Sequence, residues 1–142
     1  MNEKVLLKVL KYISIKPRTQ KEIQNYLNRF ELSSKEIEEI IDYLKRNKYL
    51  DESFLKESYI RSKVSKGFGR KYIRFKLYLR GVEVEDNEID FDPDKVVQIV
   101  KRKYSKDLEE DKHKAKRKIF NFLSYRGFSK KEILEVIKKL FD

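Results

Sequence analysis

Apolar residues recur every three or four positions along most of the chain, which is the spacing of an amphipathic α-helix. Helix starts are marked at Thr19, Ser33 and Ser129, each followed three residues later by a glutamate, as in a capping box. Asp92-Pro93 marks a further start, with an N-cap residue followed by proline in the first turn. The pattern therefore predicts helices over residues 3–14, 19–28, 33–47, 52–65, 92–104 and 108–126, and a last helix that Ser129 begins.

One helix–turn–helix pattern occurs twice, over residues 23–44 and 119–140. Self-similarity at a fixed offset is typical of repeat proteins. The matched pairs are Ile23 and Ile119, Tyr26 and Phe122, Leu27 and Leu123, Leu32 and Phe128, Ser33 and Ser129, Glu36 and Glu132, Ile37 and Ile133, Ile40 and Val136, Ile41 and Ile137, and Leu44 and Leu140. We expect Leu27 and Leu123 to occupy equivalent buried positions, and Ile41 and Ile137 to be buried on their helices.

A partial middle copy follows the first copy by 50 residues. Its apolar positions are Ile73, Leu77 and Val82, but the capped helix that should come next is eroded by polar residues, namely Asp86, Asn87, Asp90 and Asp94. We therefore predict an all-α fold of three tandem three-helix repeats that form an elongated, curved helical array. The repeats are expected at 1–50, 51–92 and 93–142, the middle one with a degraded third helix.

The middle copy also permits a second interpretation. Ile73, Phe75, Leu77 and Leu79 alternate with polar or aromatic residues, which is the period of a β-strand. A hairpin at this point, after three helices, would indicate a winged-helix DNA-binding protein. The repeat register favours a helix instead, because it aligns Ile73 and Leu77 with the second helix of the first copy.

Charge is strongly segregated along the chain, whose net charge is +11. Residues 55–80 hold nine basic side chains against one acid, residues 82–94 hold seven acids and no base, and residues 101–118 hold nine bases against four acids. The first basic stretch is interleaved with aromatic residues: Tyr59, Phe68, Tyr72, Phe75 and Tyr78. Cations neutralise phosphates and aromatic rings stack on unpaired bases, so the stretch fits a nucleic-acid backbone or an acidic protein. A solvated helix face above core aromatics is the alternative.

These stretches supply the candidate partner-binding or nucleic-acid-binding residues. They are Arg18, Arg61, Lys63, Lys66, Arg70, Lys71, Arg74, Lys76, Arg80, Lys114, Arg117, Lys118 and Arg126. Gly67 and Gly69 predict a flexible joint within the basic segment. Gly81 and Gly127 each follow an arginine at the end of a helix, where glycine closes the helix in the left-handed conformation.

The sequence contains no pattern of residues that is typical of a catalytic site. The chain has no cysteine, and its one histidine, His113, lies between two lysines in a polar stretch, as a solvated side chain would. The acids at 86–94 do not form an EF-hand loop, because Phe91 and Val97 stand where glycine and glutamate are required. We expect no enzyme activity, no cofactor and no metal. No apolar run approaches a membrane span and the N-terminus lacks a signal-peptide pattern, so we expect a cytoplasmic protein.

Several ordered motifs together resemble the RecX family, whose members modulate the RecA recombinase. The opening motif comprises Leu10, Tyr12, Ile13, Ser14, Lys16, Pro17, Arg18, Thr19, Glu22, Ile23 and Leu27. The central motifs are Tyr49-Leu50-Asp51-Glu52, Tyr59-Ile60-Arg61-Ser62 and the series Gly69, Ile73, Arg74, Leu77, Arg80, Gly81 and Val82; Arg126-Gly127-Phe128-Ser129 closes the set. Leu55, Arg70 and Lys76 depart from the family pattern, at positions where Phe, Pro and Glu are usual.

The resemblance covers essentially the whole chain and implies tandem three-helix units. It further implies a non-enzymatic regulator that binds the RecA filament on DNA and inhibits its ATPase, strand exchange and co-protease activities, in DNA repair and the SOS response. We expect a monomer that does not act at a membrane and that contacts single- or double-stranded DNA through its basic surface. Two alternatives remain: a sequence-tolerant DNA-binding protein, and a winged-helix transcription factor. Groove insertion into the filament and capping of its end both remain open.

Overall fold

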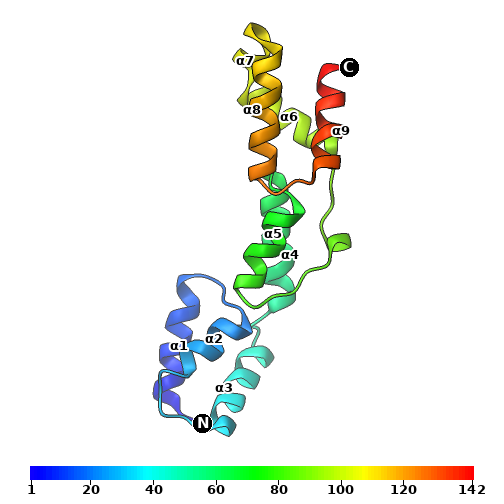
Figure 1. Cartoon of the computed structure of the whole chain (residues 1–142). Coiled ribbons are helices and arrows are strands. Elements are labelled where there is room, and N and C mark those ends of the chain that lie inside the picture. Colours follow the sequence, from blue (N-terminus) through cyan, green and yellow to red (C-terminus); the bar gives the residue numbers. More distant parts are fainter. The chain divides into compact units, whose positions relative to one another are not determined.

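The computed structural model describes residues 1–142, and its regular structure is entirely helical (Figure 1). The elements in order are α1 (Glu3–Ile15), α2 (Gln20–Leu27), α3 (Ser34–Arg46), α4 (Glu52–Ser65), α5 (Arg70–Leu79), the 3₁₀ turn η1 (Asp86–Glu88), α6 (Pro93–Lys103), α7 (Ser105–Glu110), α8 (Lys112–Tyr125) and α9 (Lys130–Phe141). The prediction of an all-α fold is confirmed. No helix has both the length and the apolar character that crossing a membrane requires.

Helix starts follow the capping signals of the sequence. Thr19, Ser33 and Ser129 each accept the backbone N–H of the glutamate three residues on, and that glutamate accepts the N–H of the cap residue. In the third of these boxes the two hydrogen bonds measure 3.1 and 2.9 Å. Asp92 caps α6 with Pro93 at the first helical position, as predicted. These bonds satisfy backbone donors that a helix start leaves without intrahelical partners.

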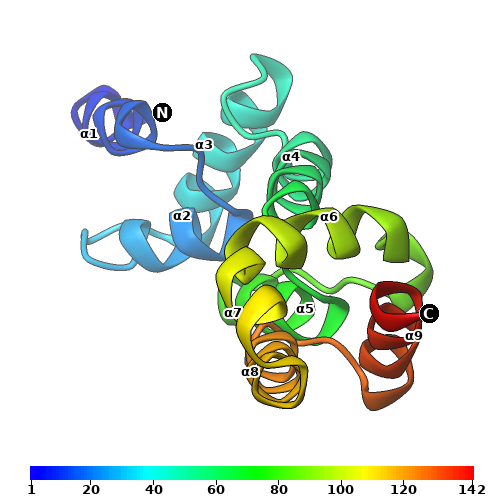
Figure 2. The same cartoon turned by 90° about the horizontal axis from the view of Figure 1, so that it is seen from above.

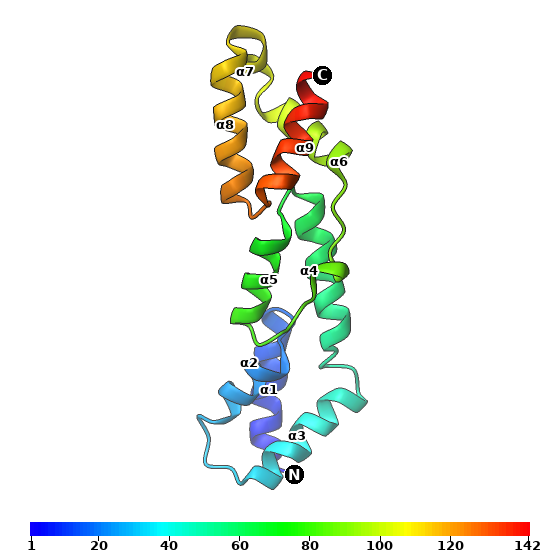
Figure 3. The same ribbon diagram turned by 45° about the vertical axis from the view of Figure 1, so that its right-hand side comes forward.

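The chain packs as two compact units, and α4 and α5 each contribute residues to both. Unit 1 comprises residues 1–58 and 77–83. In it α2 packs against α1 and α3 (Figure 3). Its core is built from Val5, Val9, Ile23, Leu27, Ile40, Ile41, Leu44 and Leu50.

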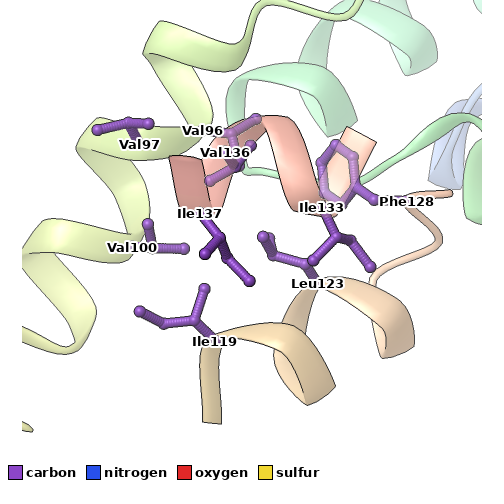
Figure 4. Close-up of a cluster of buried hydrophobic side chains, with 9 residues drawn as sticks. All are labelled: Val96, Val97, Val100, Ile119, Leu123, Phe128, Ile133, Val136 and Ile137. Atoms are coloured by element: carbon purple, nitrogen blue, oxygen red, sulfur yellow. The ribbon is translucent and has the colours of Figure 1, made fainter. Parts of the chain in front are cut away.

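Unit 2 comprises residues 59–76 and 84–142. Helix α9 packs against α6 and α8, and α6 crosses that pair steeply (Figure 2). Three helices and one turn supply its core, as Figure 4 shows: Val96, Val97 and Val100 from α6, Ile119 and Leu123 from α8, Phe128 from the turn, and Ile133, Val136 and Ile137 from α9. The division of the chain at 1–50, 51–92 and 93–142 remains a prediction.

The duplicated pattern corresponds to two helix pairs, α2–α3 and α8–α9, with no strand in either. Leu27 and Leu123, which the alignment pairs, are both buried, and so are Ile41 and Ile137. Each pair is therefore built from the same apolar positions, as the sequence predicted. The predicted burial of these four residues is confirmed.

The middle segment is helical, so the strand interpretation of residues 73–79 is wrong. Ile73 and Leu77, four residues apart, are fully buried in α5, whereas Phe75 and Leu79 are exposed. The alternation arose because α5 carries apolar residues on its exposed face as well as on its buried one. After α5 the chain forms only the short 3₁₀ turn η1, in agreement with the predicted loss of the middle repeat's third helix.

Two local predictions are corrected. The long helix expected over 108–126 is two helices, because Asp111 is extended and its side chain caps α8 by accepting the Lys114 N–H at 3.2 Å. The second correction concerns the flexible joint expected at Gly67 and Gly69, which is instead a tight contact at Gly69. Its N–H donates to the Arg126 carbonyl at 2.8 Å, and an added Cβ would lie 2.6 Å from the Gly127 carbonyl carbon.

Candidate partner-binding surface

The predicted basic residues fall into two groups, those that bind groups of the chain itself and those that face solvent. All of them except Arg18 and Arg80 belong to unit 2. The distinction matters because a guanidinium already bound inside the fold is not free to neutralise a phosphate or a partner carboxylate.

Arg80 is bound within unit 1. Its guanidinium donates to both carboxylate oxygens of Glu22, at 3.0 and 3.2 Å, and to the Pro17 carbonyl at 3.0 Å. The Thr19 hydroxyl donates to the Arg80 carbonyl at 2.6 Å and accepts the Glu22 N–H at 3.1 Å. Arg80 thus ties the end of α5 to the start of α2.

The Glu22 carboxyl is perturbed by these contacts. Its partial burial acts to raise its pKa, but the hydrogen bond from Arg80, the Thr19 N–H and the nearby positive charges outweigh burial, so the pKa of Glu22 lies below its ordinary value. Charge-assisted bonds to a carboxylate favour its ionised form. The ion pair is therefore part of the fold, with both side chains largely covered.

Arg126 plays in unit 2 the part that Arg80 plays in unit 1. Its guanidinium donates to the Lys66 carbonyl at 3.0 Å and lies 4.0 Å from the centre of the Phe68 ring, in cation–π geometry. Its carbonyl accepts the Gly69 N–H, as that of Arg80 accepts the Thr19 hydroxyl. In each unit an Arg-Gly pair at the end of one helix thus binds the residues that begin another.

The glycines of these pairs adopt the predicted left-handed conformation, with φ of +86° at Gly81 and +93° at Gly127. At Gly127 an added Cβ would also collide with the Tyr72 backbone. Only glycine meets both demands at no cost. The mirrored Arg-Gly motif in the sequence was therefore a signal of a structural contact, as well as of a helix end.

Arg70 and Arg74 bind the acidic segment, which we define as residues 83–94. Arg70 Nε donates to the Ile89 carbonyl at 2.7 Å, and its Nη1 lies 3.4 Å from a Glu132 carboxylate oxygen. Arg74 Nε donates to the Val84 carbonyl at 2.7 Å, and its Nη1 pairs with Asp86 at 2.9 Å. These side chains line a hollow of about 540 Å³ beside the starts of α5 and α9.

Arg18, Lys63 and Lys118 also have partners. Arg18 stacks 3.9 Å from the centre of the Tyr12 ring, and Lys63 lies 5.1 Å from that of Phe68. Lys118 pairs with Asp107 at 2.8 Å; this hydrogen bond raises the pKa of Lys118 and lowers that of Asp107. Both groups of this last pair lie at the surface, so its contribution to stability is small.

The remaining candidates are exposed: Arg61, Lys66, Lys71, Lys76, Lys114 and Arg117. Of these, Lys76 also has a partner, since its ammonium lies 5.5 Å from the centre of the Tyr72 ring. Of the interleaved aromatics, Phe68 and Tyr72 stack on each other, while Phe75 is 56% and Tyr78 66% exposed. Four of the exposed cations, Arg61, Lys66, Lys71 and Lys76, lie in the segment 59–76 of unit 2, which contains no acid. We call these four residues the central basic set.

Lys114 and Arg117 belong to a second surface feature that the sequence did not indicate. They lie at the rim of a hollow of about 540 Å³ in unit 2, between α8 and α9. His113 and Lys116 share the rim, and Phe120, Leu134 and Ile137 form the floor. No local motif marks the hollow, because it depends on how two helices pack.

The structure contains no cluster of metal-ligating side chains. No three side chains of the His, Cys, Asp and Glu types gather in a way that would hold a metal ion. The acids of residues 83–94 instead cap turns and bind arginines: Glu88 accepts the Glu85 N–H, and Asp86 pairs with Arg74.

Comparison with known proteins places this arrangement in a family. Residues 6–44 match the family model described as RecX, first three-helix domain, and residues 92–137 match RecX, third three-helix domain. The Regulatory protein RecX of Clostridium acetobutylicum is 30% identical over 95% of this chain and 68% of its own length. That of Staphylococcus aureus (strain Newman) is 32% identical over 95% of this chain and 52% of its own length, so the chain spans about half of this relative.

Solved structures agree on the fold. The crystal structure of RecX from Lactobacillus salivarius has a TM-score of 0.76 at 24% identity, covering 97% of this chain and 95% of that one. A second, described as regulatory protein RecX, has a TM-score of 0.69 at 22% identity, covering 96% of this chain and 72% of that one. The family models, the sequence identity and the shared fold give one answer: the chain belongs to the RecX family of regulatory proteins.

Proposed function

We propose that this chain binds the RecA recombinase filament on DNA and inhibits its ATPase, strand exchange and co-protease activities. The observation that carries the proposal is membership of the RecX family along 95% of the chain, with relatives that are named regulatory proteins. The chain acts by binding and not by catalysis. As part of the same proposal, it works as a monomer in the cytoplasm.

The exposed cations support a binding role. The central basic set presents four positive side chains that no acid of the same segment neutralises. A recombinase filament offers phosphates along its DNA and acidic side chains on its protein surface, and such a set fits either. Several weak contacts made together on one filament would add to an affinity that none reaches alone.

The experiment that tests the function measures ATP hydrolysis by the cognate recombinase on single-stranded DNA, with the chain added in increasing amounts. A regulator of the filament lowers the rate at ratios well below one chain per recombinase. A protein that acts only by covering DNA lowers it only near the amount that saturates the DNA. An unchanged rate at every ratio would contradict the proposal.

Sequence-tolerant DNA binding is the second candidate, and a specific observation favours it. Phe75 is exposed on α5 and is followed in sequence by the exposed Lys76, and an exposed aromatic ring beside a cation can stack on unpaired bases. Measuring the affinity of the chain for an oligonucleotide without recombinase separates the candidates. A filament regulator inhibits at concentrations below those that half-saturate bare DNA.

A further inference from the structure

The hollow between α8 and α9 combines an apolar floor with a basic rim. Leu134 on α9 is 50% exposed at the floor, although it is aliphatic. Phe120 on α8 is half-buried beside it, and Ile137 connects the floor to the core drawn in Figure 4. Exposing a leucine of this size to water is unfavourable, and an exposed apolar surface rimmed by polar groups is a mark of an interaction site.

The rim carries mostly positive charge. His113, Lys114, Lys116 and Arg117 come from the first turns of α8, and Asp111 is the one acid among the lining residues. The Asp111 carboxylate is already engaged, since it caps α8 by accepting the Lys114 N–H at 3.2 Å. The Lys116 ammonium lies 5.1 Å from the centre of the Phe141 ring. The side chains of Lys114 and Arg117 are exposed and form no salt bridge. The Asp107 carboxylate pairs with Lys118, and it also interacts electrostatically with Lys114, whose charge helps to lower the pKa of Asp107.

We propose that this hollow binds an acidic peptide segment of a partner protein. An aliphatic or aromatic side chain of the peptide rests on Leu134 and Phe120, and its carboxylates pair with Lys114 and Arg117. The volume, about 540 Å³, is that of a small-ligand pocket and admits one or two large side chains. This binding does not depend on the proposed action on the recombinase, since the peptide is recognised by the hollow alone.

The floor distinguishes a peptide from a nucleic acid. A phosphate backbone needs cations but no apolar surface, and an unpaired base stacks on an aromatic face. Here the floor residue most open to solvent is Leu134, which is aliphatic, while the aromatic Phe120 is half-buried and offers less of its ring to a base. An acidic peptide with an apolar residue uses both halves of the site.

The test uses the full chain and a defined probe, a fluorescein-labelled peptide of several aspartates that ends in leucine and phenylalanine. Fluorescence anisotropy follows its binding at moderate salt. A peptide with alanine in place of both apolar residues is the matched probe, and an unlabelled thymidine oligonucleotide is the competitor. We expect the apolar-ended peptide to bind more tightly than the alanine peptide, and the oligonucleotide to compete poorly.

Two variants test the two halves of the site. Leu134→Ser removes apolar floor and is expected to weaken peptide binding about tenfold. Arg117→Ser removes an exposed cation and is expected to weaken it by up to about fivefold. Their matched controls are Leu7→Ser, at a leucine 68% exposed on α1, and Arg102→Ser, at an exposed arginine on α6. Leu7→Ser should leave the affinity for the peptide unchanged. Arg102→Ser should lower it only slightly, because it removes one positive charge far from the site in sequence.

Several outcomes would overturn the proposal: no binding of the apolar-ended peptide, equal affinity for the alanine peptide, or equal losses in the control variants. Full displacement by the oligonucleotide, with Leu134→Ser weakening both ligands alike, would assign the hollow to nucleic acid. Because a variant could lose binding by misfolding, the site is also tested on the wild-type chain. Amide chemical shifts of the wild-type chain should change on peptide addition at residues 111–120 and 134–138, and a response confined to other residues would contradict the site.

Discussion

Arg80 and Arg126 bind backbone carbonyls and side chains of the fold itself, although both count toward the positive charge of the chain. Arg80 binds Glu22 and the Pro17 carbonyl, and Arg126 binds the Lys66 carbonyl and stacks on Phe68. Replacing Arg80 would leave the partly buried Glu22 carboxylate without its donor, which costs more than losing a surface charge. Replacing Arg126 would remove its bond to the exposed Lys66 carbonyl and its stacking on Phe68. Binding experiments that substitute them would therefore mix a loss of affinity with a loss of stability.

The ion pair of Glu22 and Arg80 predicts how stability depends on pH. The folded pKa of Glu22 is below its ordinary value, so the pair stabilises the fold above the unfolded pKa and this contribution is lost as pH falls through the folded pKa. Glu22→Gln should therefore be less stable than wild type at neutral pH and should lose less stability than wild type on acidification. Urea unfolding at pH 7 and pH 3 measures the difference.

The same ion pair offers a control for that measurement. Arg80→Ala should resemble Glu22→Gln in its weakened pH dependence, because it removes the other half of the pair. Glu38→Gln, at an exposed glutamate on α3, should keep the wild-type dependence. Equal pH profiles for Glu22→Gln and Glu38→Gln would show that the pair does not set the response.

At the scale of elements, local signals were enough to locate the starts of α2, α3, α6 and α9. Ser33 and Ser129 lie within three residues of the glutamates that complete their capping boxes, so the bonds are determined by adjacent sequence. The break at Asp111 was missed, because the residues on both sides of it are helix-compatible and only its own side-chain cap separates α7 from α8. The strand-like alternation in α5 was resolved only by the repeat register.

The partners of Arg70 and Arg80 could not be predicted from local sequence. Arg80 and Glu22 are 58 residues apart, and Arg70 and Glu132 are 62 apart. Tertiary packing at that range decides the partners of these two arginines, whereas Arg18 and Arg74 bind carbonyls only 6 and 10 residues away. The hollow between α8 and α9 has the same origin, since Leu134 would look like an ordinary surface leucine without α8 beside it.

The acidic segment predicts a testable effect on binding. Asp86 pairs with Arg74 at 2.9 Å, whereas Asp90 is exposed on the same segment. Asp86→Asn and Asp90→Asn remove the same charge, but only the first releases a guanidinium. We expect Asp86→Asn to strengthen binding to single-stranded DNA more than Asp90→Asn, measured by anisotropy at low salt.

Stability should barely distinguish these two variants, because both groups of the Arg74–Asp86 pair are well exposed and such pairs contribute at most about 1 kcal/mol. Equal affinities would indicate that Arg74 stays bound to the Val84 carbonyl and does not reach the DNA. A weaker Asp86→Asn complex would contradict the prediction outright.

The core of unit 2 predicts a local response to a cavity. Ile137 is buried among residues of α6, α8 and α9, so Ile137→Ala should lower the free energy of unfolding by about 2–4 kcal/mol. Hydrogen exchange should speed up in α6, α8 and α9 more than in α1–α3, because the two units have separate cores. Ile41→Ala is the matched variant in unit 1 and should reverse the pattern. Equal acceleration in both units for each variant would contradict this local response.

For the whole molecule, the net charge of +11 raises the question of whether binding depends on where the charge lies or only on how much there is. Two variants with the same net charge separate these effects. One replaces the central basic set, Arg61, Lys66, Lys71 and Lys76, by serine. The other replaces four exposed lysines of unit 1 by serine: Lys4, Lys11, Lys35 and Lys45.

If the central basic set binds phosphates, its variant should bind DNA more weakly at every sequence. Its plot of log K against log salt should flatten by roughly 0.7–0.9 for each phosphate that is no longer neutralised, while the unit 1 variant keeps nearly the wild-type slope. If the set binds acidic side chains of the recombinase, inhibition of ATP hydrolysis should fall while affinity for bare DNA is largely retained. We expect inhibition to fall more than DNA affinity, because a regulator of the filament must prefer the coated filament to free DNA. Equal reductions of both would favour the DNA-binding alternative, and equal behaviour of the two variants would show that only total charge matters.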